Sequence, residues 1–226
     1  MKIIKASAVI LSKIDYQDML RLVEIAGRTA YKSEDKITED SSEAFIRMII
    51  KRKHYAVIEF DNITVRFICD RGVSHEIVRH RLFSFCQEST CYCNYGLGKF
   101  GNEITVINPS VMFDENSVIG IVWKRGIFEA EKAYLDMLNE GGSPQEARLV
   151  LPNSLKTEIV VSGNIREWRH FMKLRCAPAA HPQMRELAIP LLKEFKEIMP
   201  VFFEDIHTEI VPDKEIIPSS FIDEQF

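Results

Sequence analysis

The clearest pattern in the chain is an alternation of apolar and polar residues over 62–69, which indicates a half-buried strand. Its apolar positions run from Ile63 to Phe67 at every second residue. The segments 2–14 and 155–162 are also rich in apolar residues and are predicted to be strands. These three segments supply the framework of a sheet.

Apolar residues at spacings of three and four predict helices between the strands. We expect the first helix, 16–29, to bury Leu22, Ile25 and Ala26. Ser143-Pro144-Gln145-Glu146 carries the strongest helix start, with serine as N-cap, proline at the first position and glutamate at the third. The other expected helices begin near Asp40, run from Ser74 into 79–81, or cover 117–140, 164–175 and 184–202.

Strands and helices are interspersed without the regular alternation that a parallel sheet requires. We therefore predict an α+β fold: a single domain over 1–226 with a mixed, mainly antiparallel sheet and several packed helices. Residues 82–103 show little periodicity, and a stretch of that length in a compact domain is often functional. The last twenty residues have a mixed pattern and are expected to pack on a neighbour or to fray.

Composition sets limits on the class of protein. The chain has 226 residues, of which 46% are hydrophobic and 27% charged, as is typical of a soluble globular protein. Its net charge of -4 argues against a general nucleic-acid binder. Five cysteines without a secretory signal indicate reduced thiols and a cytoplasmic protein. The apolar run 6–11 is too short for a signal sequence or a membrane span.

The densest cluster of chemical groups is Arg79-His80-Arg81. Two guanidinium groups beside an imidazole are costly to bury without anions, so one interpretation is a site for phosphate or carboxylate groups. The other interpretation is a solvated basic helix end, and spacing alone does not separate the two. Phe83 and Phe85 follow closely and argue against full exposure, although they also suit a core.

The same cluster begins a longer motif. Arg79-His80-Arg81, followed by Ser84 and Ser89, resembles the signature of the flavin-dependent thymidylate synthases, RHR-x2-S-x4-S-x-R. Further segments are similar to that family in the same order, from about residue 28 to residue 188. They are His54-Tyr55-Ala56-Val57-Ile58-Glu59, Ala147-Arg148 before Leu151-Pro152, Asn164-Ile165-Arg166-Glu167-Trp168, and Phe171 to Arg175.

This resemblance implies a homotetrameric enzyme that methylates dUMP to dTMP. Reduced FAD would deliver hydride to the pyrimidine ring without an enzyme nucleophile, methylenetetrahydrofolate would supply the methylene group, and NADPH would re-reduce the flavin. The sites would lie at subunit interfaces. Neither a nucleic acid, a membrane nor a metal ion is an expected partner.

The resemblance also assigns roles to individual residues. Arg175 and Ser89 would be the catalytic residues: Arg175 faces the uracil carbonyls, where negative charge develops, and Ser89 holds the phosphate together with Arg148. The residues that would bind dUMP are Glu76, Arg79, Gln87, Glu88, Ser89, Thr90, Cys91, Arg148 and Arg175. Those that would bind FAD are His54, Glu59, Arg79, His80, Arg81, Asn164 and Arg166.

Cys91 is the sharpest departure from the family signature, which has arginine there. Loss of one charge-assisted hydrogen bond to the dUMP phosphate would weaken binding about ten- to a hundred-fold, roughly 1.5–3 kcal/mol. One alternative is therefore a flavin-binding protein of the same fold with impaired activity. Another is that a second Arg or Lys contacts the dUMP phosphate in place of the missing arginine. Ala56 and the segment 179–183 are smaller departures that concern cofactor contacts.

Other chemical interpretations of these residues carry less weight. Ser84 or Ser89, activated by His80, would be a nucleophile, but serines beside arginines more often hydrogen-bond phosphate or backbone. Cys86 would need nearby positive charge to become nucleophilic, and the arginines supply it. Cys91-x-Cys93 has poor spacing for a zinc site.

A different class of function is a single-stranded nucleic-acid binding module. Such surfaces interleave basic and aromatic side chains. The candidates here are Arg79, Arg81, Phe83, Phe85, Tyr92 and Tyr95. The acidic net charge disfavours this interpretation.

Overall fold

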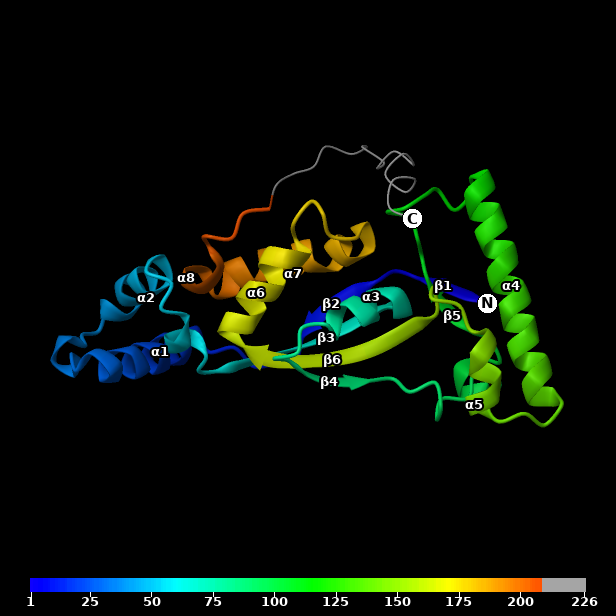
Figure 1. Ribbon diagram of the computed structural model, residues 1–226, viewed down its shortest axis with the longest axis horizontal. Coiled ribbons are helices and arrows are strands. Elements are labelled where there is room, and N and C mark those ends of the chain that lie inside the picture. The colour runs from blue at the N-terminus through cyan, green and yellow to red at the C-terminus, as the bar shows by residue number, and fades with distance from the viewer. Residues whose placement is uncertain (209–226) are drawn as a thin grey trace, which may run out of the picture.

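A computed structural model describes residues 1–208 and confirms the α+β class (Figure 1). The strands are β1 (Lys2–Ile4), β2 (Ser7–Ile10), β3 (Asn62–Asp70), β4 (Ser84–Gln87), β5 (Thr105–Ile107) and β6 (Lys156–Asn164). The α-helices are α1 (Tyr16–Tyr31), α2 (Ser41–Lys51), α3 (Arg71–Ile77), α4 (Val118–Asn139), α5 (Pro144–Ala147), α6 (Ile165–Arg175), α7 (Pro182–Ile198) and α8 (Pro200–Phe203). Short 3-10 helices are η1 (Glu34–Lys36), η2 (Tyr55–Ile58), η3 (Gly98–Phe100) and η4 (Arg148–Val150).

The main sheet has four strands in the order β2-β3-β6-β4, and each neighbouring pair is antiparallel. β3 and β6 form its centre, with Asn62 opposite Asn164 at one end and Asp70 opposite Lys156 at the other. β1 and β5 form a separate parallel pair. The two sheets together are mixed but mainly antiparallel, as the sequence predicts.

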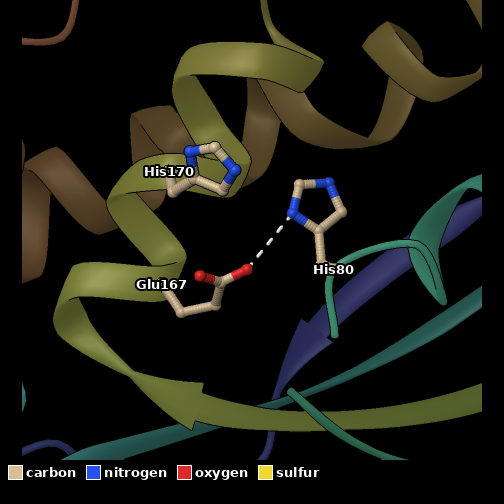
Figure 2. Close-up of side chains that lie close together, drawn as sticks. All are labelled: His80, Glu167 and His170. Atoms are coloured by element: carbon tan, nitrogen blue, oxygen red, sulfur yellow. Dashed lines mark hydrogen bonds and ion pairs between the residues drawn. The ribbon is translucent and has the colours of Figure 1, made fainter. Parts of the chain in front are cut away.

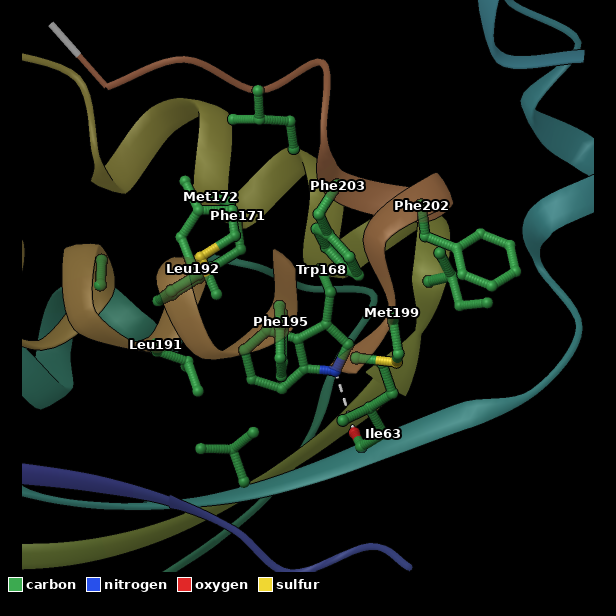
Figure 3. Close-up of a cluster of buried hydrophobic side chains, with 14 of the residues drawn as sticks. Ile63, Trp168, Phe171, Met172, Leu191, Leu192, Phe195, Met199, Phe202 and Phe203 are labelled. Carbon is green, nitrogen blue, oxygen red and sulfur yellow. Dashed lines mark hydrogen bonds between the residues drawn. The ribbon is translucent and has the colours of Figure 1, made fainter. Parts of the chain in front are cut away.

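Helices α6, α7 and α8 lie over one face of the main sheet and enclose the larger core (Figures 1 and 3). Trp168 of α6 is fully buried, and its indole Nε1 donates to the Ile63 carbonyl of β3 at 2.9 Å. Its ring packs edge-on against Phe171 and Phe195, an arrangement that aromatic pairs favour. This packing fixes α6, which carries several polar side chains of the site, against the sheet.

A smaller apolar cluster packs against α4, at the end of the molecule opposite α1 and α2 (Figure 1). Ile127 and Tyr134 of α4 are buried there with Val106 and Leu155. The opposite face of α4 stays uncovered in the single chain. Its side chains Val118, Ile121, Val122 and Phe128 are 51% to 78% exposed.

Several predicted elements have different bounds in the structure. The single helix expected over 184–202 is divided into α7 and α8. The strand expected over 2–14 is split, because β1 pairs with β5 whereas β2 pairs with β3. The helix expected from Ser74 begins at Arg71, because the Asp70 carboxylate accepts a hydrogen bond from the Val73 amide at 2.7 Å and caps it there. That helix ends at Ile77, so the 79–81 cluster lies in the following loop.

The predicted buried face of α1 is wrong. Met19, Leu20 and Val23 are buried, whereas Leu22 and Ile25 are exposed. The prediction for the last twenty residues falls almost entirely on 209–226, which lie outside the described residues.

Candidate active site

The main cavity opens between the 79–81 loop, α6 and the η2 turn, and its volume is about 510 Å³. Its cationic side chains are Arg79, Arg81, Arg166, Arg169, Lys173 and Arg175. Among the lining residues in the described part of the chain, Glu167 alone carries a carboxylate. The electrostatics of this cavity therefore favour an anionic ligand.

Helix α6 places several of these groups because it starts directly at the end of β6. The Asn164 side chain caps the helix by accepting from the Glu167 amide at 3.0 Å. Arg166, His170 and Lys173 follow at spacings of four and three, so one face of the helix turns toward the cavity. The side chain of Asn164, which was expected to bind FAD, is therefore engaged as the cap of this helix.

His80 lies between α6 and the sheet, where one of its ring nitrogens faces Glu167 (Figure 2). The other ring nitrogen contacts Arg175. Its Nδ1 is 3.3 Å from Glu167 Oε1, and its Nε2 accepts from Arg175 Nε at 3.0 Å. Burial, and next the charges of Arg175 and His170, lower the pKa of His80 from 6.5 to about 4. Burial also raises the pKa of Glu167. His80 is therefore neutral near pH 7.

The guanidinium of Arg175 donates three hydrogen bonds within the chain. Besides its bond to His80, its Nη1 donates to Glu76 Oε2 at 2.8 Å and its Nη2 donates to the Glu76 carbonyl at 2.9 Å. The structure thus brings together Glu76 and Arg175, both expected to bind dUMP. Their ion pair gives the guanidinium a fixed orientation.

Of the other residues expected to bind FAD, Arg79, Arg81 and Arg166 line the same cavity, whereas His54 and Glu59 do not. Arg79 and Arg81 are exposed, and neither has a carboxylate partner among residues 1–208. Arg166 forms an ion pair with Glu59, which caps the end of η2. His54, at the start of η2, hydrogen-bonds and stacks with Tyr31 rather than lining the cavity.

A second group of predicted residues gathers away from the cavity. Arg148 Nη1 donates to the Cys91 sulfur at 2.9 Å, and the Cys91 amide donates to Ser89 Oγ at 3.2 Å. Because β4 is antiparallel to β6, the chain moves away from the start of α6 as it passes from Ser84 to Gln87. The group Ser89, Cys91 and Arg148, which we call the Arg148 cluster, therefore lies toward the opposite end of β6 from Arg175.

The remaining residues expected to bind dUMP have contacts within the chain. Gln87 Nε2 donates to Ser74 Oγ at 2.9 Å and to Thr157 Oγ1 at 3.1 Å. Glu88 accepts from Tyr95 and from Lys156, at 3.1 and 2.9 Å. Thr90 is buried. These side chains stabilise the segment after β4 in the single chain.

Sequence reasoning gave no role to Glu167, Arg169 and Lys173, although all three line the cavity. For Arg169 and Lys173, the spacing of three and seven residues from Arg166 along one helix was the available signal, whereas Glu167 follows Arg166 directly and gave no such signal. Arg169 forms two 2.7 Å hydrogen bonds with Asp205, so its charge is already paired.

His80, Glu167 and His170 have ligand atoms within 4.8 Å of one another, a spacing compatible with a metal ion (Figure 2). The surrounding arginine and lysine side chains oppose a cation there. Cys86, Cys91 and Cys93 are free thiols, of which Cys86 is exposed. Within the described residues, no helix combines the length and apolar character needed to cross a membrane.

Comparison with known proteins gives one consistent family. The sequence model described as thymidylate synthase complementing protein matches residues 13–201. The flavin-dependent thymidylate synthase of Corynebacterium glutamicum is 34% identical, with 88% of this chain and 84% of that protein covered. The protein of the same description from Corynebacterium diphtheriae is 32% identical, with 90% and 85% covered.

A solved structure shares the fold. The UMP/dUMP methylase PolB from Streptomyces cacaoi, bound with 5-Br dUMP, superimposes with a TM-score of 0.74. The sequence identity is 21%, and the match covers 90% of this chain and 96% of PolB.

Proposed function

This chain belongs to the flavin-dependent thymidylate synthase family, and on that premise we propose that it methylates dUMP to dTMP with FAD, methylenetetrahydrofolate and NADPH. One observation carries the proposal: a cationic cavity holds one immobilised guanidinium, Arg175, beside Arg79 and Arg81, which have no carboxylate partner among the described residues. Flavin dinucleotide and nucleotide phosphates are anions that such groups bind.

The cavity suits FAD in charge and in lining. Arg79 and Arg81 would bind the diphosphate, since a guanidinium fork matches phosphate oxygens. Ile58 and Leu82 supply apolar surface for the ring system. Arg166 would bind the part of the cofactor nearest the start of α6. Bound reduced FAD supplies hydride, while the protein supplies orientation and charge.

The Arg148 cluster would hold the phosphate of dUMP, and Arg175 would donate to the uracil carbonyl oxygens. Negative charge develops on those oxygens during reaction at the ring, so a guanidinium already fixed in place stabilises the transition state. Glu76 would keep that guanidinium oriented. Gln87 and Glu88 would support the segment that carries Ser89.

We propose further that each dUMP site is shared between subunits of a homotetramer. Arg175 and the Arg148 cluster lie toward opposite ends of β6 in one chain, which suits contributions from two chains to one nucleotide. The uncovered apolar face of α4 supports assembly, because such faces mark interaction sites. The same proposal covers a single domain over 1–226, a cytoplasmic location, and no nucleic-acid or membrane partner.

A second candidate is a flavin-binding protein of this family with impaired activity. It is favoured by the contact of Arg148 with the Cys91 sulfur, since the thiol engages a guanidinium that the dUMP phosphate needs. A cysteine side chain also lacks the positive charge of the arginine in the family signature.

The test is dTMP formation from dUMP, methylenetetrahydrofolate, NADPH and FAD, with the unaltered protein, Cys91→Arg and the control Cys93→Arg. We expect product from the unaltered protein, and about ten- to a hundred-fold tighter dUMP binding by Cys91→Arg alone. Product from Cys91→Arg only would establish the impaired variant. A yellow, FAD-loaded protein that forms no dTMP in any version would contradict the proposed activity.

A further inference from the structure

We propose that Glu167 is a positioning residue, which acts through His80 to orient the guanidinium of Arg175. The proposal rests on the proposed function for the role of Arg175 in the reaction. The hydrogen-bond chain Glu167–His80–Arg175 can be measured without that reaction.

The directions of the hydrogen bonds follow from the chemistry of the groups. Arg175 Nε carries a proton and can only donate, so His80 Nε2 at 3.0 Å must lack a proton. A neutral imidazole then carries its proton on Nδ1, and this N–H donates to Glu167 Oε1 at 3.3 Å. Glu167 therefore selects the tautomer of His80 that accepts from Arg175.

Burial of both side chains strengthens the preference of His80 for this tautomer. The side chains of His80 and Glu167 are only 3% and 6% exposed, so water has little access to replace a lost partner. Phe171 and Phe83 pack beside the imidazole, with ring centroids at 4.9 and 6.0 Å. His170 is the other titratable ring in contact, edge-on at 5.6 Å. Without Glu167, the Nδ1 proton would lose its acceptor, and the alternative tautomer would place an N–H against Arg175 Nε.

Loss of the His80 bond would change the orientation of the Arg175 guanidinium rather than its charge. Arg175 has two further bonds, both to Glu76, which would keep the guanidinium near its place if the His80 bond were lost. Without the bond to His80, however, the guanidinium would be free to rotate about its two remaining contacts with Glu76. Because the N–H groups of Arg175 must point at oxygens whose charge grows in the transition state, loss of orientation lowers kcat more than it raises KM for dUMP.

Three variants of the FAD-loaded protein test the positioning role. Glu167→Met removes the acceptor at similar size and is expected to lower kcat about ten- to a hundred-fold. Glu167→Gln keeps an oxygen acceptor and is expected to retain kcat within about threefold. Glu194→Met, which changes an exposed carboxylate of α7, controls for the substitution itself. Unchanged kcat in Glu167→Met, or equal damage in Glu167→Gln, would overturn the proposal.

A spectroscopic readout separates this proposal from the proposed function. In the unaltered protein labelled with ¹⁵N-histidine, we expect His80 to show a protonated Nδ1 and an unprotonated Nε2, assigned by comparison with His80→Gln. In Glu167→Met this pattern should be lost, while Glu167→Gln should keep it. A protonated Nε2 in the unaltered protein would overturn the proposal even if dTMP forms. Absence of dTMP with the expected nitrogen pattern would reject the proposed function and leave the hydrogen-bond chain supported.

Discussion

At the scale of single residues, the site depends on which charges already have partners. Arg175 donates to His80 and twice to Glu76, whereas Arg79 and Arg81 have no carboxylate partner among residues 1–208. A guanidinium with three acceptors keeps one orientation, which suits a small reacting ring. Free guanidinium groups remain available for the phosphates of a larger ligand.

The lowered pKa of His80 predicts a loss of stability in mild acid. The pKa is about 4 in the folded chain and 6.5 in an unfolded one, so the unfolded state takes up the proton first. The contribution of His80 is therefore complete above pH 6.5 and declines as pH falls toward 4. Between pH 7 and pH 5 we expect it to reduce the free energy of unfolding by about 2 kcal/mol.

The measurement is urea unfolding at pH 7 and pH 5, at one protein concentration, for the unaltered chain and for His80→Gln. Glutamine keeps one donor and one acceptor but does not titrate. The raised pKa of Glu167 acts in the opposite direction, because a carboxyl that protonates more readily when folded gains stability in acid. That effect is present in both proteins, so the difference between them isolates His80. Equal losses would show that His80 does not titrate as stated.

At the scale of elements, the start of a helix could be predicted where neighbouring residues in the sequence supply its capping hydrogen bonds. The predicted start of α5 is confirmed as a full capping box between Ser143 and Glu146. The buried face of α1 could not be chosen in this way, because the helix carries apolar residues on two faces. Close packing decides it: a Cβ on Gly27 would lie 2.5 Å from a ring carbon of Phe45, so α1 meets α2 along the glycine side.

The capping box of α5 has a measurable consequence. Ser143→Ala removes the acceptor for the Glu146 amide, and we expect the free energy of unfolding to fall by about 1 kcal/mol. Faster hydrogen exchange should appear at Glu146 and Ala147, just before Arg148. Gln145→Ala, an exposed change in the same helix, should alter stability by only a few tenths of a kcal/mol. Equal effects of the two changes would show that the cap does not hold the turn.

At the scale of the whole molecule, the sequence identified residues that lie in contact more readily than it indicated how those contacts are arranged in space. The pairs Glu59–Arg166, Glu76–Arg175 and Cys91–Arg148 contain only residues selected beforehand, and each pair is in contact. Their functional roles stay predictions. A linear motif that joins 79–81 to Ser89 does not reveal that β4 carries its two halves apart, since this depends on pairing with β6, far along the chain.

The separation of the two halves predicts that inactive chains can complement one another. Arg175→Ala and Arg148→Ala should each abolish most dTMP formation, because each removes one half of the proposed site. If one site takes its halves from two subunits, unfolding the variants together and refolding them at equal amounts restores some sites. Random assembly leaves about one quarter of the sites with both arginines. Activity near that fraction, absent when the variants are refolded separately and mixed on ice, would establish shared sites. No recovery from a mixed tetramer would place both halves of each site on the same chain.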